Sequence, residues 1–174
     1  MKTLTTAEQA TLYKALKQDP SPQATFLMLL LETGARVTEA LNLKHSDLAG
    51  DRLRIAPLKG SNPRTVQLSP DLVQRFQALP ALPRRGLGSG AIGTLRRSLC
   101  RHFHSLTRTL LGRRLNLHAL RHAAISRVYE TTQDILATKI WAGHKSLNST
   151  LVYLHEEQRG KADSGNLGSL RALG

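Results

Sequence analysis

The sequence predicts a mainly α-helical fold that carries one small antiparallel β-hairpin, an α+β arrangement. Apolar residues recur every three or four positions over most of the chain, which is the helical period. Residues 52–58 and 64–68 alternate apolar and polar side chains instead, and the turn formers of 59–63 separate them. Two alternating runs that flank a turn are typical of a hairpin. A chain of 174 residues is long enough for one domain with its own core.

Capping signals place the helices along the chain. Thr5 and Glu8 have the spacing of a capping box, which starts a helix that runs to about Gln18. Ser21-Pro22 starts a second helix and Gly34 ends it. This second helix is largely apolar, so we expect it to be buried in the core. Further helices are predicted at 37–43, 69–79, 94–111, 118–130, 133–142 and 147–155, with a loop at 80–93.

The charge of the chain points to a polyanionic partner. Lys and Arg number 25 against 12 Asp and Glu, which leaves a net charge of +13 and a pI near 10.9. Nucleic acid is the partner that this surplus favours, and acidic lipid or a merely basic surface is the alternative. Only three Phe, three Tyr and one Trp are present, which disfavours stacking platforms for single strands.

Targeting and redox signals indicate a cytoplasmic protein. The apolar run at 26–31 is far shorter than the roughly 20 residues that span a bilayer. Residues 1–9 are polar and do not resemble a signal peptide. Cys100 is the single cysteine, so an internal disulfide is excluded. We therefore expect no membrane partner.

Three polar side chains can share one face at the start of a predicted helix. His118 and Arg121 are three residues apart, and His118 and His122 are four apart. Two histidines at this spacing can bind zinc, but the zincin motif requires Glu after the first histidine, where this chain has Ala119. With no third ligand at a suitable spacing, a metal site is disfavoured.

Arg36 lies in a predicted turn between the buried helix and the next one. Apolar chain flanks it, so its guanidinium is expected to have an anionic partner. Glu39, about one turn later, is the internal partner, and a phosphate of a ligand is the external one. Both fit together if Glu39 orients Arg36.

Tyr153 follows the pair Gly143-His144 on a short predicted helix. Leu147, Leu151 and Leu154 form the apolar stripe of that helix, and Tyr153 lies off this stripe. It is therefore not expected to anchor the helix in the core. An exposed structural tyrosine and a reactive one both remain compatible with this position.

The order of these motifs resembles the catalytic domain of the tyrosine recombinases, the phage integrase family. The matching segments are Thr33-Gly34-Ala35-Arg36, His118-Ala119-Leu120-Arg121, and Gly143-His144 nine residues before Tyr153. Leu58-Lys59-Gly60 with the run at 64–68 resembles the family's β-hairpin and its lysine. The resemblance covers about residues 22–156, and it implies the family's catalytic-domain fold.

The resemblance implies DNA strand transfer through a 3′-phosphotyrosyl intermediate, without metal, cofactor or ATP. Tyr153 would attack phosphorus, with His118 as the proton acceptor and Lys59 as the general acid. Two arginines would hold the non-bridging oxygens, which gather negative charge in the transition state. The implied catalytic set is Arg36, Lys59, His118, Arg121, His144 and Tyr153, with Glu39 supporting Arg36 and His122 in a structural role.

The resemblance also implies partners and an organisation of the chain. Double-stranded DNA is the expected substrate, bound by a homo-tetramer at the nucleoid. Residues 1–156 are expected to form one catalytic domain without the family's N-terminal DNA-clamping domain, and 157–174 a flexible or partner-docking tail. A type IB topoisomerase, or a relative that binds DNA without cleaving it, is the alternative.

Overall fold

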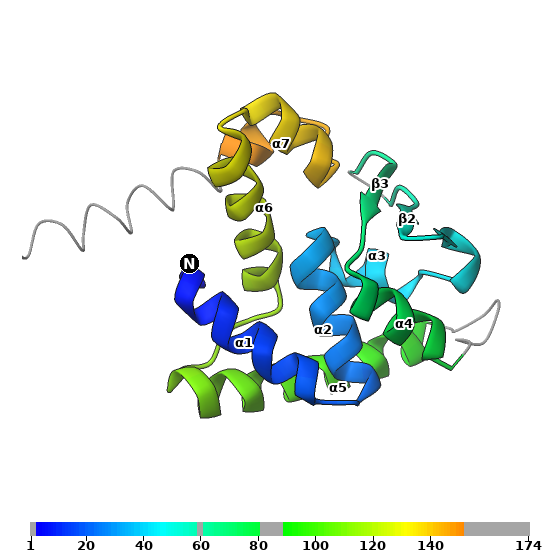
Figure 1. Cartoon of the computed structure of the whole chain (residues 1–174), viewed down its shortest axis with the longest axis vertical. Helices are drawn as coiled ribbons and strands as arrows, with labels where there is room; N and C mark the ends of the chain where they lie inside the picture. The colour runs from blue at the N-terminus through cyan, green and yellow to red at the C-terminus, as the bar shows by residue number, and fades with distance from the viewer. Residues whose placement is uncertain (1–2, 59–60, 81–88, 152–174) are drawn as a thin grey trace, which may run out of the picture.

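The computed structural model of the chain describes residues 3–58, 61–80 and 89–151. The predicted mainly α fold with a small antiparallel sheet is confirmed (Figure 1). The helices are α1 (Thr6–Gln18), α2 (Pro22–Thr33), α3 (Val37–Leu41), α4 (Pro70–Ala78), α5 (Ser89–Leu111), α6 (His118–Thr132) and α7 (Ile135–Ala142). The strands are β1 (Leu48–Ala49), β2 (Arg52–Ile55) and β3 (Arg64–Gln67), and a 3-10 turn at His45–Asp47 precedes β1.

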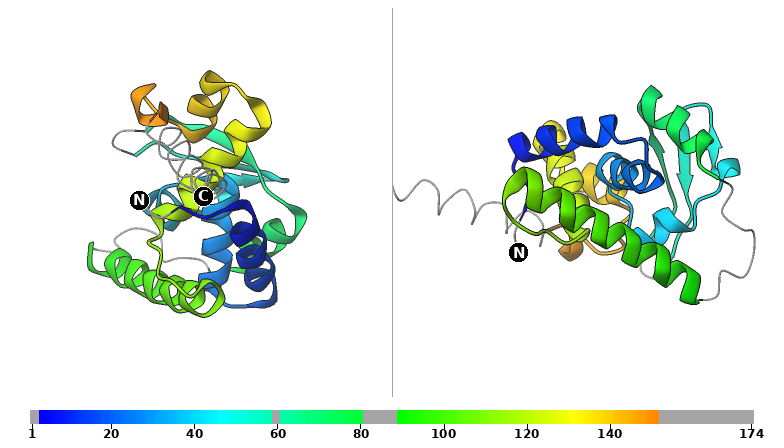
Figure 2. Two further views of the ribbon diagram at one scale, coloured as in Figure 1. Left: turned by 90° about the vertical axis from the view of Figure 1, so that its left-hand side faces the viewer. Right: turned by 90° about the horizontal axis from the view of Figure 1, so that it is seen from below.

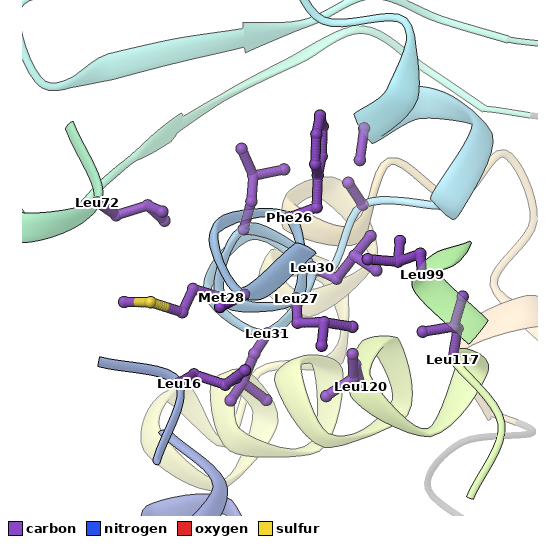
Figure 3. Close-up of a cluster of buried hydrophobic side chains, with 14 of the residues drawn as sticks. Leu16, Phe26, Leu27, Met28, Leu30, Leu31, Leu72, Leu99, Leu117 and Leu120 are labelled. Atoms are coloured by element: carbon purple, nitrogen blue, oxygen red, sulfur yellow. The ribbon is translucent and has the colours of Figure 1, made fainter. Parts of the chain in front are cut away.

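Helix α2 is the centre of the hydrophobic core, as predicted. Every residue from Ala24 to Leu31 is buried. Figure 3 shows its leucines surrounded by Leu16 of α1, Leu99 of α5 and Leu120 of α6. Burying a leucine completely stabilises the folded state by about 1.5–3 kcal/mol. Because α2 is apolar on all sides, neighbouring elements stabilise it on every side.

The sheet contains three strands in the order β1-β2-β3, all antiparallel. Strands β2 and β3 are the predicted hairpin, with Leu53 opposite Val66 and Ile55 opposite Arg64. Strand β1 was not predicted, because its two residues are too few to show an alternating pattern. In Figure 1 the hairpin lies at the same end of the molecule as α7, and β3 contacts α7.

Two helices start at least two residues away from the predicted position. Helix α5 begins at Ser89 rather than at 94, and it runs along one side of the molecule (Figure 2). Its early start is stabilised by Ile92 and Leu95, which pack on the core and offset the helix-weakening glycines beside them. Gln133 does not start α7 but ends α6 in the left-handed region, at φ 53°. Asp134 caps α7 instead: its side chain accepts hydrogen bonds from the backbone N–H groups of the helix's second and third residues.

Several predictions fall on residues outside the described ranges. Lys59, Tyr153 and the tail at 157–174 are among them. The predicted helix at 147–155 is seen only at its start, where residues 148–151 are helical. Within the described ranges, no helix is both long enough and apolar enough to span a membrane.

Candidate active site

The turn after α2 brings three helices together. Gly34 ends α2 in the left-handed conformation, at φ 60°. A methyl group on Gly34 would lie 2.8 Å from the ring of Trp141 on α7, so this position requires glycine for conformation and for space. The chain then leaves the core in extended form, and Arg36 becomes the N-cap of α3.

Glu39 binds the side chain of Arg36, as predicted, and also its backbone N–H. Its carboxylate accepts a hydrogen bond from the backbone N–H of Arg36 at 2.8 Å and another from Nη1 of the same residue at 3.3 Å. The Glu39 side chain is fully buried, whereas that of Arg36 is 34% exposed. Burial opposes ionisation of Glu39, but hydrogen bonds from Arg64 and the Arg36 backbone outweigh it and lower its pKa to about 2.

Arg121 lies in the first turn of α6 and is buried. Its Nη1 donates to the carbonyl of Gly34, and its Nη2 donates to the carbonyl of Ala142 at 3.0 Å. These bonds fix the plane of the guanidinium between the ends of α2 and α7. A guanidinium has five N–H donors, so two such bonds do not exhaust it.

A surface pocket of about 510 Å³ joins several of the predicted residues. Arg36, His118 and Arg121 contribute to its wall. His118 is exposed at the first position of α6, whose N-terminus is the positive end of the helix dipole. The remaining lining residues come from the loop before α6, from α5 and from the start of α3: Ala35, Val37, Thr38, Arg96, Cys100, Asn116 and Leu117.

His144 is buried next to this cationic cluster. Burial and the positive charges of Arg121, Arg36 and Arg64 lower its pKa to about 4. It is therefore neutral at neutral pH, with one ring nitrogen as donor and the other as acceptor. Nδ1 lies 3.0 Å from the hydroxyl of Thr150, and a bond donated by that hydroxyl would place the ring proton on Nε2.

The structure adds two residues that the sequence reasoning missed. Arg64 is buried and donates from Nη2 to Glu39 Oε2 at 2.9 Å. Its signal was available, because Arg64 occupies an inward position of β3, alternating with exposed Thr65 and in line with buried Val66. Thr150 is fully buried against His144, and no sequence pattern marks it.

The predicted residues therefore divide into three groups. Arg36, His118 and Arg121 share the pocket, with Glu39 and His144 buried beside them. His122 is buried, and its Nδ1 lies 3.4 Å from the Ser126 hydroxyl, which agrees with a structural position. Lys59 and Tyr153 are not described.

The donor set suits a tetrahedral oxyanion. Two guanidinium groups and a helix N-terminus meet at the pocket, and a neutral imidazole lies beside them. In the part of the chain that the structure describes, no three Cys, His, Asp or Glu side chains group as a metal site. A phosphate group is the ligand class that this chemistry fits best.

Comparison with known proteins agrees with this chemistry. The model of the phage integrase family matches residues 2–85. A putative integrase/recombinase, y4qK of Sinorhizobium fredii, is 30% identical over 135 residues, which is 70% of this chain. The match covers 42% of that relative, so the chain spans less than half of its length.

Solved structures show the same fold. The catalytic domain of bacteriophage HP1 integrase superposes with a TM-score of 0.61 at 21% identity, covering 89% of this chain and 88% of that one. The XerH site-specific recombinase, solved bound to its palindromic difH substrate after cleavage, gives a TM-score of 0.69 at 19% identity. That match covers 94% of this chain but 52% of XerH.

Proposed function

This chain belongs to the phage integrase family of tyrosine recombinases, and from that premise we propose that it catalyses site-specific DNA recombination. The single observation that carries the proposal is the pocket that Arg36, His118 and Arg121 share, with Glu39 and His144 beside it. These groups match what a phosphodiester requires at its non-bridging oxygens.

We propose the following division of labour at the scissile phosphate. Tyr153 attacks phosphorus and forms a 3′-phosphotyrosyl bond while the 5′ oxygen leaves. The bond conserves the energy of the broken phosphodiester, so a 5′ hydroxyl can reverse the step without ATP. His118 accepts the proton of the Tyr153 hydroxyl, whose ordinary pKa is about 10. Lys59 supplies a proton to the departing oxygen.

The two arginines and the buried imidazole stabilise the negative charge that develops on the phosphate oxygens. Arg36 and Arg121 donate to the non-bridging oxygens, which carry more negative charge in the transition state than in the ground state. Arg121 is pre-organised by its hydrogen bonds to two backbone carbonyls of other residues, and Arg36 by its ion pair with Glu39. Neutral His144 donates from Nε2 to a phosphate oxygen, provided that Thr150 donates to its Nδ1.

We further propose that the active species is a homo-tetramer on double-stranded DNA, at the nucleoid, with residues 1–156 as the catalytic domain. The XerH relative was solved on a DNA substrate. A net charge of +13 supports DNA as the partner here as well. Self-association is supported by α7, where Leu136 and Ile140 lie one turn apart and are 58% and 73% exposed.

The test is covalent capture on DNA. A pool of nicked duplexes with a randomised central segment is incubated with the full chain in EDTA, and denaturant-resistant protein–DNA adducts are isolated and sequenced. We expect the wild-type protein to enrich one sequence family through a 3′ linkage, and Tyr153→Phe to form no adduct. The enriched duplex then serves as the defined substrate for rate measurements.

Each other outcome contradicts part of the proposal. An adduct that persists in Tyr153→Phe would remove Tyr153 as the nucleophile, and a requirement for divalent metal would remove the arginine-based mechanism. Retention of duplexes without any adduct would identify a DNA-binding relative that does not cleave. Relaxation of a supercoiled plasmid that lacks the enriched sequence would identify a topoisomerase.

A further inference from the structure

We propose that Arg64 is a positioning residue of this active site: it holds Glu39 behind Arg36 and sets the β2–β3 hairpin against the Gly143-His144 turn. The inference rests on the proposed function, because the residues that Arg64 would position are those of the strand-transfer site. It assigns Arg64 no contact with the substrate.

The location of Arg64 is unusual for an arginine. Its side chain is 4% exposed, at the inward-facing first position of β3. Nη2 donates to Glu39 Oε2 at 2.9 Å. The same carboxylate binds Arg36, and its Oε2 lies 4.0 Å from Arg121 Nη1. Arg64 therefore shares one carboxylate with both arginines of the pocket.

Nη1 and Cδ of Arg64 pack against the turn after α7. A methyl group on Gly143 would lie 2.7 Å from Arg64 Nη1 and 3.2 Å from its Cδ. Gly143 has φ +67°, so glycine is needed for conformation as well as for this contact. Arg64 thus fills the space directly beneath the turn that presents His144.

Stability alone does not explain an arginine at this position. Its Nε and Nη1 are buried and have no hydrogen-bond partner among the described residues. Buried donors without acceptors are unfavourable, and well-packed apolar residues of similar volume often replace buried ion pairs without loss of stability. An arginine that keeps two such donors is better explained by what its charge and its Glu39 contact do for the neighbouring groups.

Residues just before Arg64 in the hairpin contact the Gly143-His144 turn directly. The backbone N–H of Asn62 donates to the Gly143 carbonyl at 2.9 Å, and Ser61 pairs with His144 as an isolated β-bridge. Arg64 follows these residues at the start of β3. It therefore ties β3, the strand that follows the predicted catalytic lysine, Lys59, in the sequence, both to Glu39 and to the Gly143-His144 turn.

Arg64 also contributes to the electrostatic environment of His144. The charged groups that act most strongly on this imidazole are Arg121 of α6, Arg36 at the start of α3, Arg64 of β3 and Glu39 of α3. Glu39 favours the imidazolium form and the three arginines oppose it. Removing the Arg64 charge is expected to make His144 easier to protonate, which would weaken its role as a neutral donor.

The experiment compares Arg64→Met and Arg64→Lys with a matched control. Arg113 is the control because it also binds a glutamate, Glu8, in an ion pair whose residues do not line the pocket. Arg64→Met is expected to slow single-turnover adduct formation by about 100-fold, with the dissociation constant for DNA changed by less than about threefold. Arg64→Lys keeps the charge and one donor to Glu39, so its rate is expected within about fivefold of wild type. Arg113→Met is expected to cleave at the wild-type rate.

A second readout separates positioning from simple structural support. The His144 imidazole is titrated by NMR in each protein without DNA. Its pKa is expected to rise in Arg64→Met and to stay near the wild-type value in Arg64→Lys and Arg113→Met. This readout tests Arg64 even if the wild-type chain forms no adduct, in which case the proposed function fails by itself.

Two results would overturn the inference. One is cleavage by Arg64→Met at the wild-type rate. The other is equal loss in the Met and Lys variants with an unchanged His144 titration, which would mean that the residue only supports the fold. If circular dichroism shows that Arg64→Met is unfolded, Arg64→Gln, which also removes the charge but keeps an N–H donor for Glu39, takes its place in both measurements. Should that variant not fold either, the Lys variant decides, and a rate more than about tenfold below wild type counts against the proposal.

Discussion

The Nδ1 atom of His144 lies 3.0 Å from the hydroxyl of Thr150, and both side chains are buried. Thr150 belongs to the helical segment at 148–151, three residues before Tyr153 in the sequence. The contact therefore connects the Gly143-His144 turn to the segment that leads to the proposed nucleophile. A hydrogen bond donated by this hydroxyl to Nδ1 would leave the ring proton on Nε2, from which it can be donated toward a phosphate.

Thr150→Val should slow DNA cleavage with little effect on DNA binding. Valine has nearly the same shape, so the substitution removes the hydroxyl and leaves the packing in place. One lost hydrogen bond of about 1–1.5 kcal/mol corresponds to roughly a tenfold lower rate. The measurement is single-turnover adduct formation on the captured duplex.

Thr138→Val is the matched control for this change. Thr138 is also fully buried, but its hydroxyl donates to the Asp134 carbonyl of its own helix cap rather than to His144. It should cleave at the wild-type rate. Equal cleavage by both variants would show that Thr150 does not orient His144.

Gly34→Ala should destabilise the fold at the point where the pocket is assembled. Its methyl group would meet Trp141 at 2.8 Å, and φ +60° is unfavourable for alanine. Strain in the left-handed region costs about 1–2 kcal/mol and overpacking about 1–3 kcal/mol, so the free energy of unfolding should fall by roughly 2–5 kcal/mol. Urea denaturation measures this loss.

Gly112→Ala separates the two causes. Gly112 has φ +65°, but nothing lies within 4 Å of the added methyl group. It should lose only the conformational part, about 1–2 kcal/mol. A Gly34→Ala variant no less stable than Gly112→Ala would mean that Trp141 moves aside without cost.

Local signals predicted the helices best where caps and apolar runs agree. Ser21-Pro22 and Gly34 bracket α2 within one residue, because a proline-led start and a left-handed stop are set by the nearest residues alone. The start of α5 was missed for the opposite reason. Its glycines signal a loop locally, whereas the packing of Ile92 and Leu95 on distant helices stabilises helix there.

The site could be predicted only as far as motif spacing reaches. Arg36, His118, Arg121 and His144 were named from short motifs, and the structure gathers them around one pocket and its buried margin. Contacts between segments far apart in the chain leave no local pattern. Thr150 was missed for another reason: its partner His144 is only six residues away, but a buried threonine on a short helix looks like any other. Arg64 is intermediate, since its inward register on β3 was readable but its partner Glu39 was not.

Lys59→Met should cleave normal DNA slowly, and a substrate with a better leaving group should restore the cleavage rate. If Lys59 protonates the departing 5′ oxygen, its loss should slow cleavage of normal DNA by about 10²-fold or more. A substrate with sulfur at the 5′ bridging position expels a thiolate, which needs no such proton. The rate of Lys59→Met on that substrate should approach that of wild type, as measured by adduct formation on both duplexes. A deficit of equal size on both would assign Lys59 another role.

Ile140→Asp should separate cleavage from strand exchange. Ile140 is 73% exposed on α7 and lies outside the pocket lining, so a charge there should leave adduct formation on one duplex within about twofold of wild type. If that face mediates assembly, exchange between two duplexes should be lost. Normal exchange by this variant, measured by gel separation of recombinant duplexes, would place the tetramer contact elsewhere.

Acid should weaken the fold first through His144 and then through Glu39. The folded-state pKa of His144 is about 4, below its ordinary value of 6.5. Its contribution to stability is therefore complete above pH 6.5 and is lost as the pH falls toward 4, because the unfolded chain binds the proton first. The pKa of Glu39 is about 2 against an ordinary 4.5, so its contribution is lost between pH 4.5 and 2.

His144→Gln tests the first of these two windows. The lowered pKa of His144 corresponds to at most about 3 kcal/mol of unfolding free energy. Between pH 6.5 and 4, the wild-type protein should lose up to this amount more than the variant does. Glutamine keeps polar atoms in the buried site but cannot titrate, so the curve of unfolding free energy against pH should be flatter in this window. Below pH 4 the two curves should fall in parallel, because Glu39 is present in both proteins. Parallel curves over the whole range would show that the folded-state pKa of His144 is not lowered, so that burial and the neighbouring arginines do not keep the ring neutral below pH 6.5.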